Sequence, residues 1–121
     1  MTILDRDSIL GADDRKIETV TIPEWGGDVH IRTMSGAERD AFEASLFVGK
    51  GKGENREANM RNLRARLASL TIVDDKGDRI FSNSDVKELG AKSAAALDRI
   101  FTAAQRLNGL TDSDVTDLAG E

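Results

Sequence analysis

The sequence contains no cysteine and no tyrosine, and proline, tryptophan and histidine each occur once in its 121 residues. Without cysteine there is no disulfide, no thiolate metal site and no cysteine nucleophile, and the composition fits a reducing compartment. The single histidine, His30, alternates with Val29 and Ile31, so we expect it on the solvated face of a strand. No serine lies in a nucleophile-elbow context. The residues therefore predict a protein that is not an enzyme, with no catalytic residue, metal site or cofactor.

Long apolar runs are missing as well. No stretch approaches the roughly 20 apolar residues that span a bilayer, and the N-terminus carries acidic residues early, unlike a signal peptide. We therefore expect a soluble, cytoplasmic protein with no membrane partner. Charged residues make up 32% of the chain and hydrophobic residues 39%, which indicates a modest core under a strongly solvated surface. The length predicts a single domain over residues 1–121.

Charge is unevenly distributed along this chain of net charge −5. Residues 49–70 are basic, whereas the last ten residues contain only acidic charges. The basic segment supplies four arginines as candidate electrostatic contacts: Arg56, Arg61, Arg64 and Arg66. They either solvate the outer face of a helix, contact the acidic tail of a neighbouring copy in self-association, or bind phosphate. The acidic net charge and the lack of interleaved aromatic residues disfavour nucleic acid as a partner.

Two segments show the alternation of a β-hairpin. Residues 18–22 and 28–32 each place apolar side chains on one face, and Pro23 and Gly26-Gly27 supply the connection between them. A second, smaller hairpin is predicted over residues 71–81, with a tight turn at 74–77. The acidic residues of that turn do not follow the ligand order of an EF-hand calcium loop.

Helical periodicity accounts for most of the remaining chain. A capping box of Ser35 and Glu38 predicts a helix over 36–48, and further helices are expected over 54–70, through Leu89, and over 93–107. A first helical turn at 5–10 is expected to lay Ile3, Ile9 and Leu10 on the domain. The glycine-rich segment 49–53 predicts a mobile loop, and 111–121 an acidic, fraying tail. The fold class is therefore α+β and mostly helical. Three to four main helices pack with one or two short antiparallel hairpins in a folded body over 5–110.

An ordered set of segments resembles the tail assembly chaperones of long, non-contractile-tailed phages and prophages. The segments are VTIPEWGGDVHIR at 20–32, SGAERDAFE at 35–43, LRARL at 63–67, VDDKG at 73–77, Phe81, KSAAALDRI at 92–100 and AQRLNGL at 104–110. The resemblance implies a protein that binds the tape measure protein, keeps it soluble and promotes tail tube assembly by recruiting the tail tube protein. It implies location in the cytoplasm of the bacterial host and absence from the mature virion.

A chaperone of this kind needs apolar surface on a charged body. The candidate partner-binding residues lie on the expected hairpin and on the helix that follows it: Trp25, Val29, Ile31, Phe42 and Leu46. Each could equally belong to the core, and Trp25 either folds back over its own hairpin or anchors a partner. Two other functions stay open. One is a structural tail or head–tail joining component retained in the virion, and the other, less favoured, is a small nucleic-acid-binding regulator.

Overall fold

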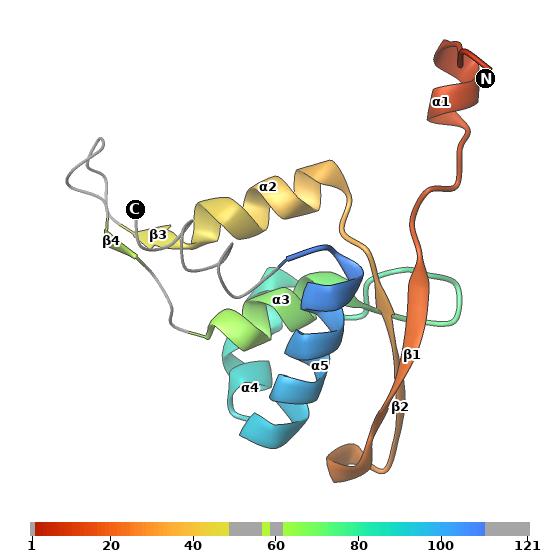
Figure 1. Ribbon diagram of the computed structural model, residues 1–121. Helices are drawn as coiled ribbons and strands as arrows, with labels where there is room; N and C mark the ends of the chain where they lie inside the picture. The colour runs from red at the N-terminus through yellow and green to blue at the C-terminus, as the bar shows by residue number, and fades with distance from the viewer. Residues whose placement is uncertain (1, 49–56, 59–61, 111–121) are drawn as a thin grey trace.

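A long β-hairpin runs along one side of the molecule (Figure 1). The computed structural model describes residues 2–48, 57–58 and 62–110. Strand β1 (Ile17–Ile22) pairs antiparallel with β2 (Gly27–Arg32), and a short 3-10 turn, η1 (Pro23–Trp25), joins them. Gly26 closes this turn with a φ of 73°, a left-handed conformation that favours glycine. The predicted hairpin is confirmed to within one residue at each strand.

A third strand lies against the hairpin, and it corrects the prediction of a second hairpin. Strand β5 (Ile72–Val73) pairs antiparallel with β2, which becomes the central strand. The predicted tight turn is present, with the Gly77 amide donating to the Asp74 carbonyl at 3.0 Å. Beyond the turn, however, only one bridge joins Val73 to Arg79. Beside β2, Ile72 and Val73 are buried, with exposed fractions of 1% and 4%.

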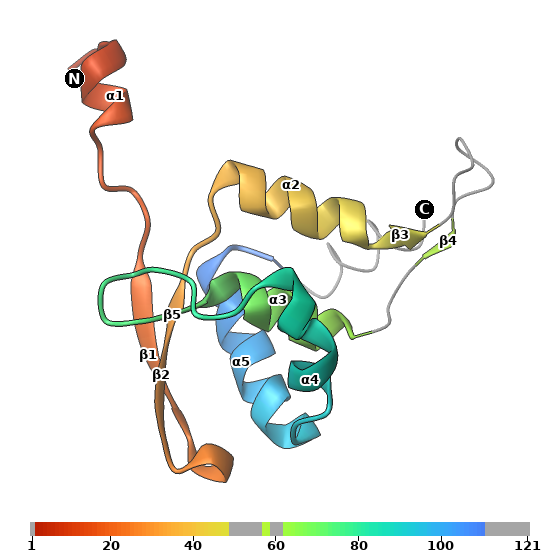
Figure 2. The same cartoon turned by 180° about the vertical axis from the view of Figure 1, so that it is seen from behind.

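The helices cover one face of this sheet (Figures 1 and 2). Helix α5 (Ala94–Leu107) packs on β1 and β2, and α3 (Leu63–Thr71) packs on α5. The short α4 (Val86–Gly90), preceded by the 3-10 turn η3 (Asn83–Asp85), lies against α3. Helix α2 (Gly36–Ser45) also contacts α3. Helices on one face of an antiparallel sheet are an α+β fold, so the predicted fold class is confirmed.

The core lies between the hairpin and the helices. Residues opposite one another in an antiparallel pair share a face, so Val20, paired with Val29, lies on the same face as Ile31. Helix α5 covers that face with buried residues spaced three or four apart, in agreement with the predicted stripe. The largest fully buried apolar side chains are Ile22, Ile31, Phe42, Leu46, Leu67, Ile72 and Ile100.

Two predicted helices are shorter than their periodicity suggested. Helix α2 begins at the predicted capping box but ends at Ser45, and residues 47–48 form β3 (Phe47–Val48), which pairs with β4 (Glu57–Ala58). Phe and Val favour extended backbone, which explains this early end. The helix predicted over 54–70 begins only at Leu63, because Asn62 has a φ of 54°. A left-handed residue cannot continue an α-helix, and asparagine tolerates that conformation.

The N-terminal segment contradicts the expectation that it packs on the domain. Helix α1 (Arg6–Leu10) forms, but it stands away from the body in both views (Figures 1 and 2). The exposed fractions of Ile3, Ile9 and Leu10 are 93%, 57% and 68%. Five residues of helix present too little apolar surface to fix their position against the sheet. We call residues 2–14 the N-terminal arm.

Several expectations fall outside the described residues. These are the mobile loop at 49–53 and the fraying tail at 111–121. The single domain over 1–121 therefore stays a prediction.

Candidate functional site

Trp25 forms one wall of a pocket between the hairpin connection and α4. The indole is half-buried and packs against the core, and the pocket has a volume of about 340 Å³. Phe81 and Leu89 supply the other apolar walls. The charged lining residues are Asp85, Glu88 and Lys92. We call this the Trp25 pocket. An apolar pocket with charged residues among its lining fits an apolar side chain that has polar neighbours.

An ion pair fixes the hairpin connection that carries Trp25. Arg99 on α5 donates from Nε to Glu24 Oε1 at 3.0 Å and from Nη2 to Oε2 at 3.3 Å. This hydrogen bond from the Arg99 guanidinium lowers the pKa of the Glu24 carboxyl below its ordinary value. A two-point contact between η1 and α5 restrains the neighbouring indole, so the pocket wall is positioned before any partner arrives.

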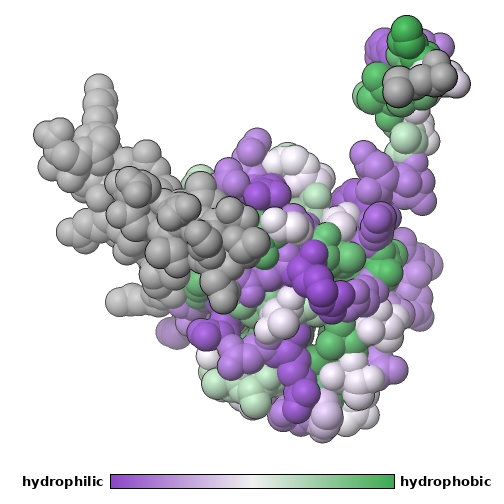
Figure 3. Space-filling model, viewed as in Figure 1, coloured by the Kyte–Doolittle hydropathy of each residue, from purple (hydrophilic) through white to green (hydrophobic). Residues whose placement is uncertain are grey.

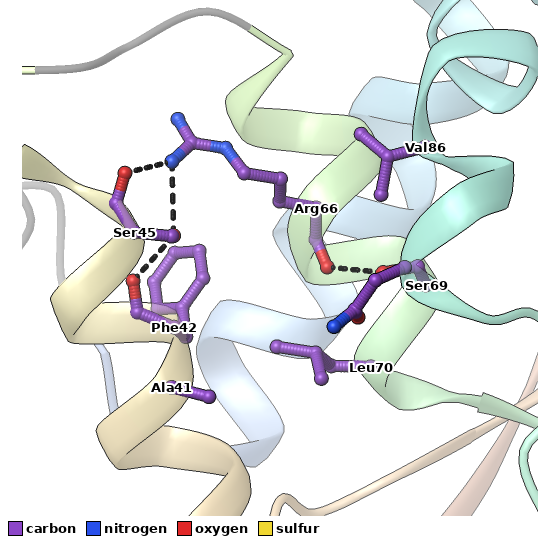
Figure 4. A pocket seen from close by; sticks show the side chains of 8 residues that line it. Ala41, Phe42, Ser45, Arg66, Ser69, Leu70 and Val86 are labelled. Atoms are coloured by element: carbon purple, nitrogen blue, oxygen red, sulfur yellow. Dashed lines mark hydrogen bonds between the residues drawn. The ribbon is translucent and has the colours of Figure 1, made fainter. Parts of the chain in front are cut away.

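A second pocket lies between α2 and α3 (Figure 4). Its volume is about 290 Å³, and Phe42, Leu70 and Val86 form its apolar walls. The remaining lining residues are Ala41, Ser45, Arg66, Ser69 and Asn83. We call this the α2–α3 pocket. Among the residues that the structure describes, Arg66 is the one charged residue of this lining.

Arg66 bridges the two helices at this pocket. Its Nη1 donates to the backbone carbonyl of Ser45 and, at 2.9 Å, to the Ser45 hydroxyl (Figure 4). Burial lowers the pKa of the guanidinium, but arginine keeps its charge in proteins. The α2–α3 pocket therefore combines apolar walls with a retained positive charge.

The structure separates the five predicted partner-binding residues. Trp25 and Val29 are half-buried at the edge of the core, whereas Ile31, Phe42 and Leu46 are fully buried, with exposed fractions of 0 to 1%. Of the five, Trp25 lines one pocket, and Phe42 forms an inner wall of the other. Their roles in partner binding stay predictions, and for the three buried residues contact with a partner would require the core to open.

Two of the four predicted electrostatic contacts can be placed. Arg64 on α3 pairs with Asp98 and lies over the Phe101 ring at 5.8 Å from its centroid. Arg66 turns toward α2 instead, as described above. Each guanidinium therefore has a contact within the protein. Arg56 and Arg61 lie outside the described residues.

Sequence reasoning did not find the two pockets. Their walls come from segments distant along the chain, such as Trp25 with Phe81, or Ala41 with Leu70. A period-two or period-3.6 pattern shows which residues share a face, but not which faces leave a gap between them. The nearest signal was the lone tryptophan at the hairpin connection.

Within the described ranges, no three histidine, aspartate or glutamate side chains come together as a metal-binding group. His30 makes ordinary contacts instead, to the Thr19 hydroxyl at 2.9 Å and to Asp75 Oδ1 at 3.0 Å. In the same part of the chain, no helix has the length and apolar character needed to cross a membrane.

Comparison with known proteins identifies the family. The fold is similar to that of the bacteriophage HK97 tail assembly chaperone, with a TM-score of 0.58 and 19% identity over 88% of this chain and 95% of that one. A Saccharomyces cerevisiae protein named for an endoplasmic reticulum mannosidase, MNL2, is 26% identical over 98 residues. The chain spans only 12% of that protein's length, so the likeness carries no activity over. The family model described as phage tail assembly chaperone matches residues 11–120. The predicted resemblance is confirmed, and the chain belongs to the phage tail assembly chaperone family.

Proposed function

We propose that this chaperone binds the tape measure protein of a phage or prophage, keeps it soluble and promotes tail tube assembly. The observation that carries the proposal is the Trp25 pocket. It is an apolar recess of about 340 Å³ in a chain whose residues are 32% charged. A soluble body with a positioned aromatic wall can cover apolar side chains of a client without itself aggregating.

The lining of the Trp25 pocket suggests what kind of client segment fits. Apolar walls from Trp25, Phe81 and Leu89 accept an aliphatic or aromatic side chain. Asp85 and Glu88 give the lining a net negative charge despite Lys92. A client helix with apolar residues three or four apart and a nearby lysine or arginine satisfies both conditions.

We also propose where the chaperone acts and that the tail tube protein is its second partner. The client is made in the cytoplasm of the bacterial host, so the chaperone acts there and leaves before the virion is complete. Release of the covered apolar surface to the tail tube protein then couples protection of the client to tube assembly.

Co-expression with the tape measure protein tests the client. We expect the client to become soluble and to co-purify in the presence of the chaperone. Trp25→Ala should weaken binding about 30-fold, corresponding to the roughly 2 kcal/mol typical of an aromatic anchor. Ile80→Ala is the matched control, because Ile80 is 51% exposed and does not line the pocket.

Two outcomes would count against the proposal. One is a client that is equally soluble alone and retains no chaperone. The other is equal loss of binding in both variants, which would show that the Trp25 pocket is not the contact.

Mass spectrometry of purified virions separates this function from that of a structural tail or head–tail joining component. The chaperone should be missing from the particle. Detection at a fixed number of copies per virion would favour the structural role.

A further inference from the structure

The outer edge of β1 has no partner strand within the described residues, because the sheet is ordered β1-β2-β5. In an antiparallel pair, every second residue directs its amide and carbonyl away from the partner strand. The Thr33 amide donates to the Lys16 carbonyl at 3.0 Å, which continues the register of β1 with β2 by one position. The alternation that follows leaves the backbone groups of Ile17, Thr19 and Thr21 directed outward.

Strand β1 lacks the features that usually keep an edge strand from pairing. Natural edges carry proline, a bulge or an inward-pointing charge. The register of β1 with β2 has no bulge, and Pro23 comes only after the strand ends. The one charge of the strand, Glu18, is paired with Arg106 of α5 at 2.6 Å. The N-terminal arm precedes β1 but projects away from the body (Figure 3).

A groove of about 550 Å³ lies between this edge strand and α5. Its lining on the strand side is Glu18, Thr19, Val20 and Thr21, and on the helix side Asp98, Arg99, Thr102, Ala103 and Arg106. The helical wall from Asp98 to Arg106 is about 12 Å long at 1.5 Å per residue. That length matches roughly four residues of extended chain. We call this the β1–α5 groove.

The charged groups of the β1–α5 groove are paired with one another or with neighbours. The pairs are Glu18 with Arg106, Arg99 with Glu24, and Asp98 with Arg64. Among the described lining residues every charge is thus compensated, so the groove favours neutral side chains on an inserted strand. A second copy that paired through the same edge would bring its own Glu18 to this face, and like charges on neighbouring strands destabilise the pairing.

The β1–α5 groove is linked to the site proposed for the client. Arg99 belongs to the helical wall and also holds Glu24, the neighbour of Trp25. Strand β1 runs directly into η1, which carries Trp25. A client segment on the edge of β1 would therefore continue the surface that begins at the Trp25 pocket.

We propose that β1 binds an extended, uncharged segment of the client, which adds to the sheet as a further strand. This inference rests on the proposed client binding and gives the chaperone a second contact of a different kind. The outward amides and carbonyls of β1 bond to the client backbone, and Val20 and Ala103 contact every second client side chain. Backbone pairing depends little on side chains, so the contact can recur at many places along one client.

Substitution of Thr21 tests the backbone contact. Thr21→Pro removes an outward amide but no hydrogen bond to β2, and proline is tolerated at such a position of an edge strand. It should weaken binding of the tape measure protein about fivefold or more, the change that one lost hydrogen bond produces. Thr21→Val is the matched control, because it keeps the amide and suits a strand. It should bind as the unsubstituted chain does.

Equal binding by the two Thr21 variants would overturn the inference. If Trp25→Ala still weakened binding in that case, the proposed function would stand without the edge contact. A tape measure protein that binds none of these chains would overturn both.

Hydrogen exchange gives a second measurement, which needs no substitution. The outward amides should exchange at least about tenfold more slowly in the purified complex with the tape measure protein than in the chaperone alone. The amides directed at β2 are the internal control and should change little: Glu18, Val20 and Ile22. Unchanged exchange at the outward amides would contradict the inference. So would slowing in the chaperone alone as its concentration rises, because a second copy would then occupy the edge.

Discussion

Phe42 connects the core to the α2–α3 pocket, because its ring is 1% exposed and also forms a pocket wall. Phe42→Ala should therefore lower the free energy of unfolding by about 3 to 5 kcal/mol, the range for a buried phenylalanine that leaves a cavity. Urea denaturation followed by Trp25 fluorescence measures this loss. The exposed control Ile80→Ala should change the free energy by less than about 0.5 kcal/mol. A loss below about 1 kcal/mol for Phe42→Ala would mean that the ring is not packed as the structure shows.

The pair of Glu24 and Arg99 predicts a pH dependence. The hydrogen bond from Arg99 holds the pKa of the folded Glu24 carboxyl below its ordinary value of 4.5. Its stabilising effect is therefore fully present above pH 4.5 and is lost as the pH falls through the folded pKa. Glu24→Gln should flatten the decline in stability between about pH 5 and about pH 3. Arg99→Gln should flatten it in the same way, whereas a slope unchanged in both variants would contradict the pairing.

At single residues, the sequence predicted which face of an element a side chain lies on better than how completely that side chain is buried. The alternation on the hairpin placed Val29 and Ile31 on one face, and both do contact the core. It could not show that Ile31 would be fully covered and Val29 only in part, because coverage depends on where α5 lies over the strands. For the same reason Trp25 could not be assigned as a pocket wall until Phe81 and Leu89 were placed beside it.

Among the elements, the start of α2 combines a capping box with an ion pair to Arg15. Glu38 accepts from the Ser35 amide at 2.8 Å in the capping box and also from Arg15 at 2.7 Å. Ser35→Ala removes the cap alone and should cost about 1 kcal/mol. Glu38→Ala removes the cap and the tie to the base of the arm, so it should cost more. A double-mutant cycle with Arg15→Ala should show coupling of at least about 0.5 kcal/mol. Additive losses would indicate that Arg15 and Glu38 act independently.

The elements that were predicted correctly are those with local determinants. Helix α5 has a capping serine, a long apolar stripe and a terminating Asn108, and the hairpin has its alternation and its glycine turn. The errors came where distant partners decided the outcome. Strand β5 forms its ladder with the distant strand β2. Residues 57–58, predicted to be helical, instead form strand β4, which pairs with β3.

At the scale of the whole molecule, the two pockets share no lining residue within the described part of the chain. The described lining of the Trp25 pocket includes two carboxylates, and that of the α2–α3 pocket includes an arginine. A substitution in one pocket therefore leaves the described lining of the other unchanged.

The separate linings predict that substitutions in the two pockets act differently on client binding. Trp25→Ala should reduce affinity for both a short and a long tape measure segment, because it removes the aromatic wall of the Trp25 pocket. Ala41→Glu, which changes the α2–α3 pocket, should leave affinity for both segments unchanged.

For Ala41→Glu and the unsubstituted chain, the affinity is measured by titrating the fluorescence of Trp25 with client segments of two lengths. Trp25→Ala lacks this fluorophore, so its affinity is measured by calorimetry. Equal losses on both lengths in Ala41→Glu would show that the α2–α3 pocket contacts the client directly, contrary to client binding at the Trp25 pocket. A loss confined to the long segment would require cooperation between copies, because the short segment engages only one Trp25 pocket. Client length thus distinguishes a chaperone that coats its client from one that binds it one molecule at a time.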